Sequence, residues 1–103
     1  MAQAEYIVSD LPESALEASA RFHAEHLSAA RAAMGEGDLV IILPRAEYDH
    51  LDWREALARD LARACAPARV NVIAAGNEAE KRKLLAYLAG AKGVTGHYCQ
   101  THD

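Results

Sequence analysis

The feature that most restricts the fold of this chain is a run of five apolar residues, Leu39-Val40-Ile41-Ile42-Leu43. The run does not alternate between apolar and polar side chains, so both faces of a strand built from it need cover. Strands buried on both faces are typical of parallel sheets with helices on each side. The run is also far too short to cross a bilayer. It therefore predicts an inner strand of an α/β sheet.

Helix and strand signals alternate along the remainder of the 103 residues. Glycine or proline ends each helical pattern, and Asn77 with Glu80 three residues later forms a helix-capping pattern. The expected elements are strands over 5–9, 39–43, 69–75 and 94–101, and helices over 10–34, 51–66 and 81–89. This βαβαβαβ order predicts one domain, residues 1–103, with an α/β fold in which three helices connect a four-stranded parallel sheet.

The composition argues against several classes of function. The formal net charge is −4 and no basic stripe runs along the chain, so we expect no nucleic-acid partner. Residues 1–10 lack a basic region followed by an apolar run, so we expect no signal peptide and no membrane partner. Cys65 and Cys99 are far apart and form no CxxC pair, which favours two free thiols. These features predict a cytoplasmic protein.

Three stretches of the chain, taken together, resemble the short-chain dehydrogenase/reductase family. They read HLSAARAAMGEGDLVII, EALARDLARACAPARVNVIAAG and AYLAGAKGVTGHYCQTHD. They resemble, in order, the family's long helix before the strand that bears its catalytic serine, the helix that runs into an "RVN" strand, and the closing helix with its "VTG" strand. The resemblance implies a Rossmann-like half-fold that corresponds to the C-terminal half of that family. It also implies that strand order follows chain order and that the last helix lies on the opposite face of the sheet from the first two.

The positions that the resemblance links to chemistry hold other residues here. No Gly-rich turn follows the first strand, and a chain of this length leaves no room for the family's first half. Leu43-Pro44 stands in the place of the family's serine. Tyr48 lies near the place of its tyrosine, but Asp52 rather than lysine follows four residues later. We therefore expect no catalytic residues, no bound cofactor and no dehydrogenase activity.

Two short segments remain as candidate ligand sites. Tyr48 and His50 follow the apolar strand at its carboxyl end, where α/β sheets bind ligands. Gly76 and Asn77 open the last helix, and helix N-termini can bind anions. Each segment also has a simpler interpretation, a solvated loop for the first and an ordinary helix cap for the second.

The C-terminal tail carries His97, Cys99 and His102, which are possible metal ligands. A structural zinc site takes about four ligands, and this spacing fixes too few. We therefore expect no metal site.

A half-fold of this kind leaves surfaces that need a partner. Its first strand would present an open edge at Tyr6 and Val8, and one face of the sheet would have a single helix. The first helix carries two apolar stripes, of which the second includes Phe22 and Ala29. We therefore expect a homodimer built through Phe22 and Ala29 or through Tyr6 and Val8, or docking on a full-length short-chain dehydrogenase.

Two functions follow from these expectations. The first is a non-catalytic Rossmann-like protein that acts through self-association or as an accessory subunit of a full-length reductase. The alternative is a small-ligand or nucleotide-binding protein, or an enzyme, with a site rebuilt near Tyr48 and His50.

Overall fold

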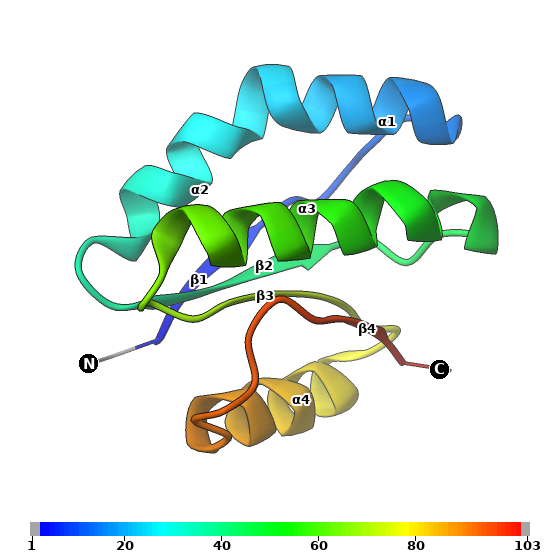
Figure 1. The fold of residues 1–103 in the computed structure, drawn as a ribbon. Helices are drawn as coiled ribbons and strands as arrows, with labels where there is room; N and C mark the ends of the chain where they lie inside the picture. Colours follow the sequence, from blue (N-terminus) through cyan, green and yellow to red (C-terminus); the bar gives the residue numbers. More distant parts are fainter. Residues whose placement is uncertain (1–2, 102–103) are drawn as a thin grey trace.

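A computed structural model describes residues 3–101 as a four-stranded parallel sheet with helices on both faces (Figure 1). The strands lie in the order β1-β2-β3-β4, which is also their order along the chain. These findings confirm the predicted fold class and strand order. The elements are β1 (Gln3–Ile7), α1 (Ala15–Arg21), a π-helical turn η1 (Phe22–His26), α2 (Leu27–Met34), β2 (Asp38–Leu43), a 3-10 turn η2 (Tyr48–His50), α3 (Leu51–Cys65), β3 (Val70–Ala74), α4 (Glu78–Gly90) and β4 (Tyr98–Gln100).

The apolar run in β2 is buried on both of its faces, as its lack of alternation predicts. Leu39, Ile41 and Leu43 face the layer formed by α1, α2 and α3. Val40 and Ile42 face the opposite side, where they pack with Leu85 and Leu88 of α4. In Figure 1 the first helices and α3 lie above the sheet and α4 lies below it, which confirms the placement that the resemblance implied.

The first helix departs from the predicted pattern because η1 interrupts it with one π-helical turn. A π turn holds one more residue than an α-helical turn. The residues after it are therefore shifted by one position relative to the face that a continuous α-helix would turn toward the sheet. Phe22 and Ala30 are buried against the sheet, whereas Ala29 and Ala33 are exposed. The predicted stripe that placed Phe22 and Ala29 on one face of the helix was therefore wrong.

The N-terminal start of α1 also differs from the prediction. The predicted helix began at residue 10, but Ser14 is the N-cap, since its hydroxyl oxygen accepts the backbone N–H of Glu17 at 3.2 Å. Residues 10–13 instead form a loop beyond the carboxyl end of β1. This loop borders the site described below.

Two residues of the "RVN" stretch fasten the C-terminal part of the fold. Arg69 donates from Nη1 to the carbonyl oxygens of Leu88 and Ala91, at 2.9 and 2.6 Å. Asn71 is buried, donates to the carbonyl of Val94 and accepts the backbone N–H of His97, both at 3.1 Å. Side-chain bonds thus hold residues 94–97 as a loop, which is why β4 is shorter than predicted.

None of the helices between residues 3 and 101 combines the length and the apolarity needed to cross a bilayer.

Candidate functional site

A cavity of about 330 Å³ lies beyond the carboxyl ends of β1 and β2. The loop over residues 10–13 and the loop over residues 44–47 form two of its walls, and His50 and Arg54 complete it. Its volume is within the range of small-molecule sites, and parallel sheets place their ligands at this edge. We therefore treat it as the candidate site.

The most unusual residue of the cavity is Arg54, a charged side chain that is only 1% exposed. Its Nη1 donates to the carbonyl oxygen of Pro44 at 2.7 Å and to the hydroxyl of Tyr98 at 3.1 Å. Its guanidinium carbon lies 5.3 Å from the centroid of the Trp53 ring and 5.8 Å from that of Tyr98. Two aromatic faces, one carbonyl oxygen and one hydroxyl thus surround the charge.

Arg54 has no counter-ion among residues 3–101, and its Nε has no hydrogen-bond partner there. A buried charge without a carboxylate is costly, because aromatic rings and carbonyl dipoles replace only part of its hydration. The guanidinium fork matches carboxylate and phosphate groups, which it can bind with two parallel hydrogen bonds. The arrangement therefore favours an anionic group as the missing partner.

His50 forms the wall beside Arg54 and is itself buried. Trp53 donates from Nε1 to its Nδ1 at 3.2 Å, so Nδ1 is the acceptor and the ring hydrogen lies on Nε2. Nε2 then donates to the carbonyl oxygen of Glu13 at 2.8 Å. Both ring nitrogens are engaged, so His50 fastens the loop after β1 to α3 and gives the cavity a fixed shape.

Tyr48, the other predicted residue of this segment, lies outside the cavity. Its side chain is 88% exposed and borders a separate hollow of about 130 Å³ with Leu51, Tyr98 and Gln100. The structure therefore brings His50 to the site and leaves Tyr48 beyond it, on the outer side of η2.

The second predicted segment has its polar groups occupied. Asn77 is the N-cap of α4, and its Oδ1 accepts the backbone N–H of Glu80 at 2.8 Å. The backbone N–H of Gly76 donates to the hydroxyl of Thr101 at 3.0 Å. Glu78 and Glu80 also place two carboxylates in the first turn of α4. This geometry agrees with the simpler interpretation, an ordinary helix cap.

Arg54 was not among the predicted site residues, because the sequence pattern places most charged residues of this helix away from its apolar stripe. The spacing of Arg54 relative to the apolar residues of α3 nevertheless indicates that it is buried. Arg54 precedes Leu57, Ala58 and Leu61 by three, four and seven residues, which puts it on their face of the helix. All three of those residues are buried.

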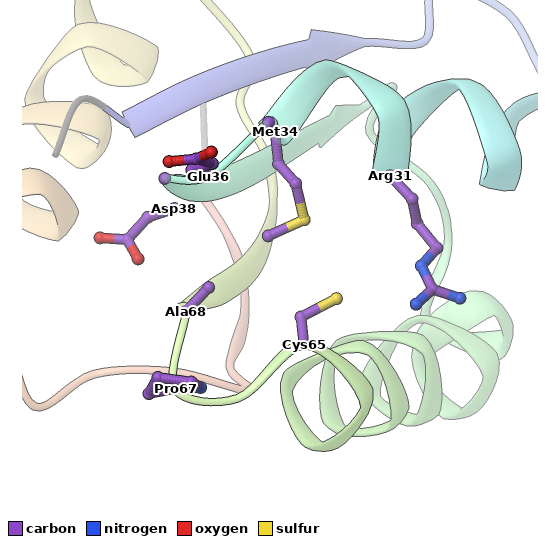
Figure 2. A pocket seen from close by; sticks show the side chains of 9 residues that line it. Arg31, Met34, Glu36, Asp38, Cys65, Pro67 and Ala68 are labelled. Carbon is purple, nitrogen blue, oxygen red and sulfur yellow. The ribbon is translucent and has the colours of Figure 1, made fainter.

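A larger hollow, of about 620 Å³, lies at the opposite edge of the sheet, near the amino ends of the strands. Figure 2 shows the Cys65 thiol of α3 and the Arg31 guanidinium of α2 pointing into it. The Asp38 carboxylate on its border is already paired with Arg69, at 2.8 Å. This hollow holds no buried charge in need of a partner, so the smaller cavity is the better candidate despite its size.

The residues predicted for a dimer interface lie in different environments. Phe22 and Val8 are buried in the core of this chain, so neither has free surface to offer a partner. Tyr6 is half-buried, and its hydroxyl lies 3.0 Å from Nδ1 of His26. Ala29 is exposed on the outer side of α2.

The described part of the chain contains no group of three or more His, Cys, Asp or Glu side chains that could hold a metal ion. Cys65 and Cys99 are free thiols, as expected. Of the predicted tail cluster, His97 and Cys99 are exposed and His102 lies outside the described residues.

The cavity does not fit a dinucleotide cofactor. Neither of the two loops that border it contains a glycine, so no backbone is open for the close approach of a pyrophosphate. Carboxylates of Asp10, Glu13 and Glu47 line the space in which phosphates would lie. The place of the family's catalytic serine holds Leu43, which is buried, and Pro44, whose carbonyl oxygen binds Arg54.

Most of the chain is similar to one known protein family. Residues 6–101 match the family model of the SDR-like group, described as short chain dehydrogenase-like protein. No curated protein and no solved structure matches the chain. The family match covers nearly all of the described residues, and the parallel sheet with helices on both faces agrees with it. The chain therefore belongs to the short chain dehydrogenase-like family.

Proposed function

We propose that this chain is a non-catalytic member of its family that binds a small ligand in the cavity beside Arg54 through an anionic group of that ligand. The observation that carries the proposal is the buried guanidinium of Arg54, which borders a cavity at the ligand-binding edge of the sheet and has no counter-ion among residues 3–101. This function corresponds to the alternative that the sequence suggested near Tyr48 and His50, with His50 in the cavity wall and Arg54 as the residue that contacts the ligand.

The residues at the family's catalytic positions support binding rather than reduction. Leu43 and Pro44 offer no hydroxyl at the end of β2. Tyr48 and Asp52 are both exposed and do not line the cavity. No side chain bordering the cavity is a serine, threonine, tyrosine or lysine, so a family-type proton relay has no residues there.

The test is a titration of ¹⁵N-labelled protein with acetate, succinate and inorganic phosphate, followed by backbone amide chemical shifts. We expect at least one probe to shift the amides of residues 10–13 and 44–54 in a saturable manner, and Arg54→Met to abolish the response. Arg59→Met is the matched control, since Arg59 lies on the same helix but is exposed. Shifts that persist in Arg54→Met would place the anion elsewhere and overturn the proposal.

Binding of NAD or NADP is tested in the same way. We expect no saturable binding tighter than about 100 μM, which corresponds to about −5.5 kcal/mol. Ketone or alcohol turnover with either cofactor would contradict the non-catalytic part of the proposal, above all if Tyr48→Phe removed it.

A second candidate function is self-association through the β1 edge, and one observation favours it. Among residues 3–101, β1 pairs only with β2, and Ile7 on it is 56% exposed. Open edges with apolar side chains favour strand pairing with another chain. A second copy, or a full-length short-chain dehydrogenase, could supply the missing neighbour.

Sedimentation equilibrium at micromolar concentration tests this candidate. We expect a species of twice 11.1 kDa, and a monomer for Ile7→Lys, because a lysine on an edge strand opposes pairing. Leu16→Lys is the control, since Leu16 is exposed on α1 and not on the edge strand. A folded wild-type monomer would exclude the homodimer, and mixing with a full-length reductase would then test the accessory role.

A further inference from the structure

We propose that the ligand is zwitterionic and of the α-amino acid class, with its carboxylate on Arg54 and its ammonium group at the acidic mouth of the cavity. The inference rests on the proposed anion site and adds the second charge of the ligand. It starts from the charges around the cavity: the buried charge is positive, and three of the four exposed charges are negative.

The positive charge lies at the inner end of the cavity. Arg54 is 1% exposed, so only a group that enters the cavity can reach it. Beside it, His50 has both ring nitrogens engaged, with Trp53 and with the carbonyl oxygen of Glu13. The inner end thus offers one guanidinium and no free acceptor side chain, which suits a carboxylate.

The negative charges lie at the mouth. Asp10 and Glu13 come from the loop after β1, and Glu47 comes from the loop after β2, so carboxylates border the cavity on two sides. All three are exposed, and none forms an ion pair within residues 3–101. Arg45 is the only other cation that lines the cavity, and it is likewise exposed and unpaired there.

This distribution opposes a ligand with negative charge alone. A phosphate or a dicarboxylate that reached Arg54 would leave part of its charge beside three carboxylates of the same sign. A metal ion is not the expected neutraliser, because these carboxylates do not form a cluster that could hold one in the described structure. An ammonium group on the ligand would lie beside the carboxylates at the mouth, while the ligand's carboxylate pairs with the guanidinium of Arg54.

The cavity also has the right dimensions for such a ligand. Its volume of about 330 Å³ is at the lower end of small-molecule sites. An α-amino acid carries its ammonium and its carboxylate on the same α-carbon, so both can be held within one small cavity. The apolar wall from Leu11, Pro12 and Ala46 is then available for a side chain.

The experiment screens the twenty common L-amino acids by amide chemical shifts of the full chain. The strongest binder is then compared with its deaminated carboxylate and its decarboxylated amine. For leucine these are 4-methylpentanoate and 3-methylbutylamine. We expect the amino acid to bind at least tenfold more tightly than the carboxylate, and the amine not to bind. The triple variant Asp10→Asn, Glu13→Gln, Glu47→Gln should remove the preference and leave carboxylate binding in place.

The outcomes separate the two proposals. Equal binding of the amino acid and its carboxylate would overturn the zwitterion and leave the anion site standing. The same holds if phosphate binds more tightly than every amino acid. Absence of binding by all carboxylates and phosphate would overturn both. Should Arg54→Met fail to fold, Arg54→Lys keeps the charge but loses the bidentate fork, and binding that it leaves unchanged would contradict the assigned role of Arg54.

Discussion

Arg69 holds the carboxylate of Asp38 at 2.8 Å, across the amino ends of β2 and β3. Burial would raise the pKa of Asp38, but the backbone N–H and the guanidinium of Arg69 more than offset this, and the pKa is lowered from its ordinary 3.8. The same guanidinium binds carbonyl oxygens at the end of α4. One ion pair thus joins two strands and the helix on the far face.

Replacement of Asp38 by asparagine should destabilise the fold in a pH-dependent way. We expect a loss of roughly 1.5–3 kcal/mol at pH 7, as for hydrogen bonds to charged groups. Because the pKa of the folded state is lowered, the stabilisation is present above pH 3.8 and is lost as the pH falls through the folded-state value. The difference between wild type and variant in urea unfolding should therefore shrink below pH 3.8. Asp60→Asn, which removes an exposed pair with Arg63, should change stability by less than about 1 kcal/mol.

Phe22 should behave as a core residue and not as an interface residue. It is fully buried and packs near Trp53 and His26. Phe22→Ala should cost about 3–5 kcal/mol in thermal or denaturant unfolding. Leu16→Ala in α1, the helix that continues into η1, should cost less than about 0.5 kcal/mol, because Leu16 is 83% exposed. A stable Phe22→Ala protein that merely dissociates would contradict the structure.

Gly96 should resist substitution although it lies in a loop. Its φ of +76° is unfavourable for other residues, and an added Cβ would lie 3.3 Å from the Cβ of Ala62. We expect Gly96→Ala to lower the free energy of unfolding by about 1–3 kcal/mol. Gly93→Ala is the matched control, since its Cβ would meet nothing within 4 Å. Equal stability of the two variants would show that the loop adapts freely.

Arg54→Met separates a binding role from a structural one. A buried guanidinium without a carboxylate partner costs desolvation energy, and an apolar side chain of similar length avoids that cost. We expect the variant to unfold at the same or a higher denaturant concentration than wild type, within about 1 kcal/mol, while ligand binding disappears. A loss of more than about 2 kcal/mol in the free energy of unfolding would instead show that Arg54 has a structural role through its bonds to Pro44 and Tyr98.

Features set by local pattern were predictable from the sequence. The unbroken apolar run indicates β2 and its burial on both faces, and Asn77 with Glu80 indicates the start of α4. The resemblance gave the order of strands and the face on which α4 lies. These features depend on neighbours in the chain or on a shared topology.

Features set by tertiary contacts were not predictable in the same way. A π turn leaves the composition of a helix unchanged, so the placement of Phe22 in the core and of Ala29 on the outer side, on different faces of the helix, could not be read from spacing. Arg54 is a charged residue at a buried position. The contacts that accommodate it there, with the Trp53 ring and the Pro44 carbonyl oxygen, come from tertiary structure and are not visible in the sequence. The candidate site moved by a few residues for this reason, from Tyr48 to Arg54.

The π turn over Phe22–His26 lets the continuous helical segment of α1, η1 and α2 lose one residue without a change in the orientation of its two ends. Deletion of one residue there would restore an ordinary α-helical turn. An insertion elsewhere in α1 or α2 would rotate the helical residues that follow it by about 100° around the helix axis. The ring of His26, stacked near Phe22 and bonded to the hydroxyl of Tyr6, marks the point at which the helical segment is anchored to β1. A variant of this chain that lacks one residue in this segment can therefore keep the same sheet contacts on either side of it.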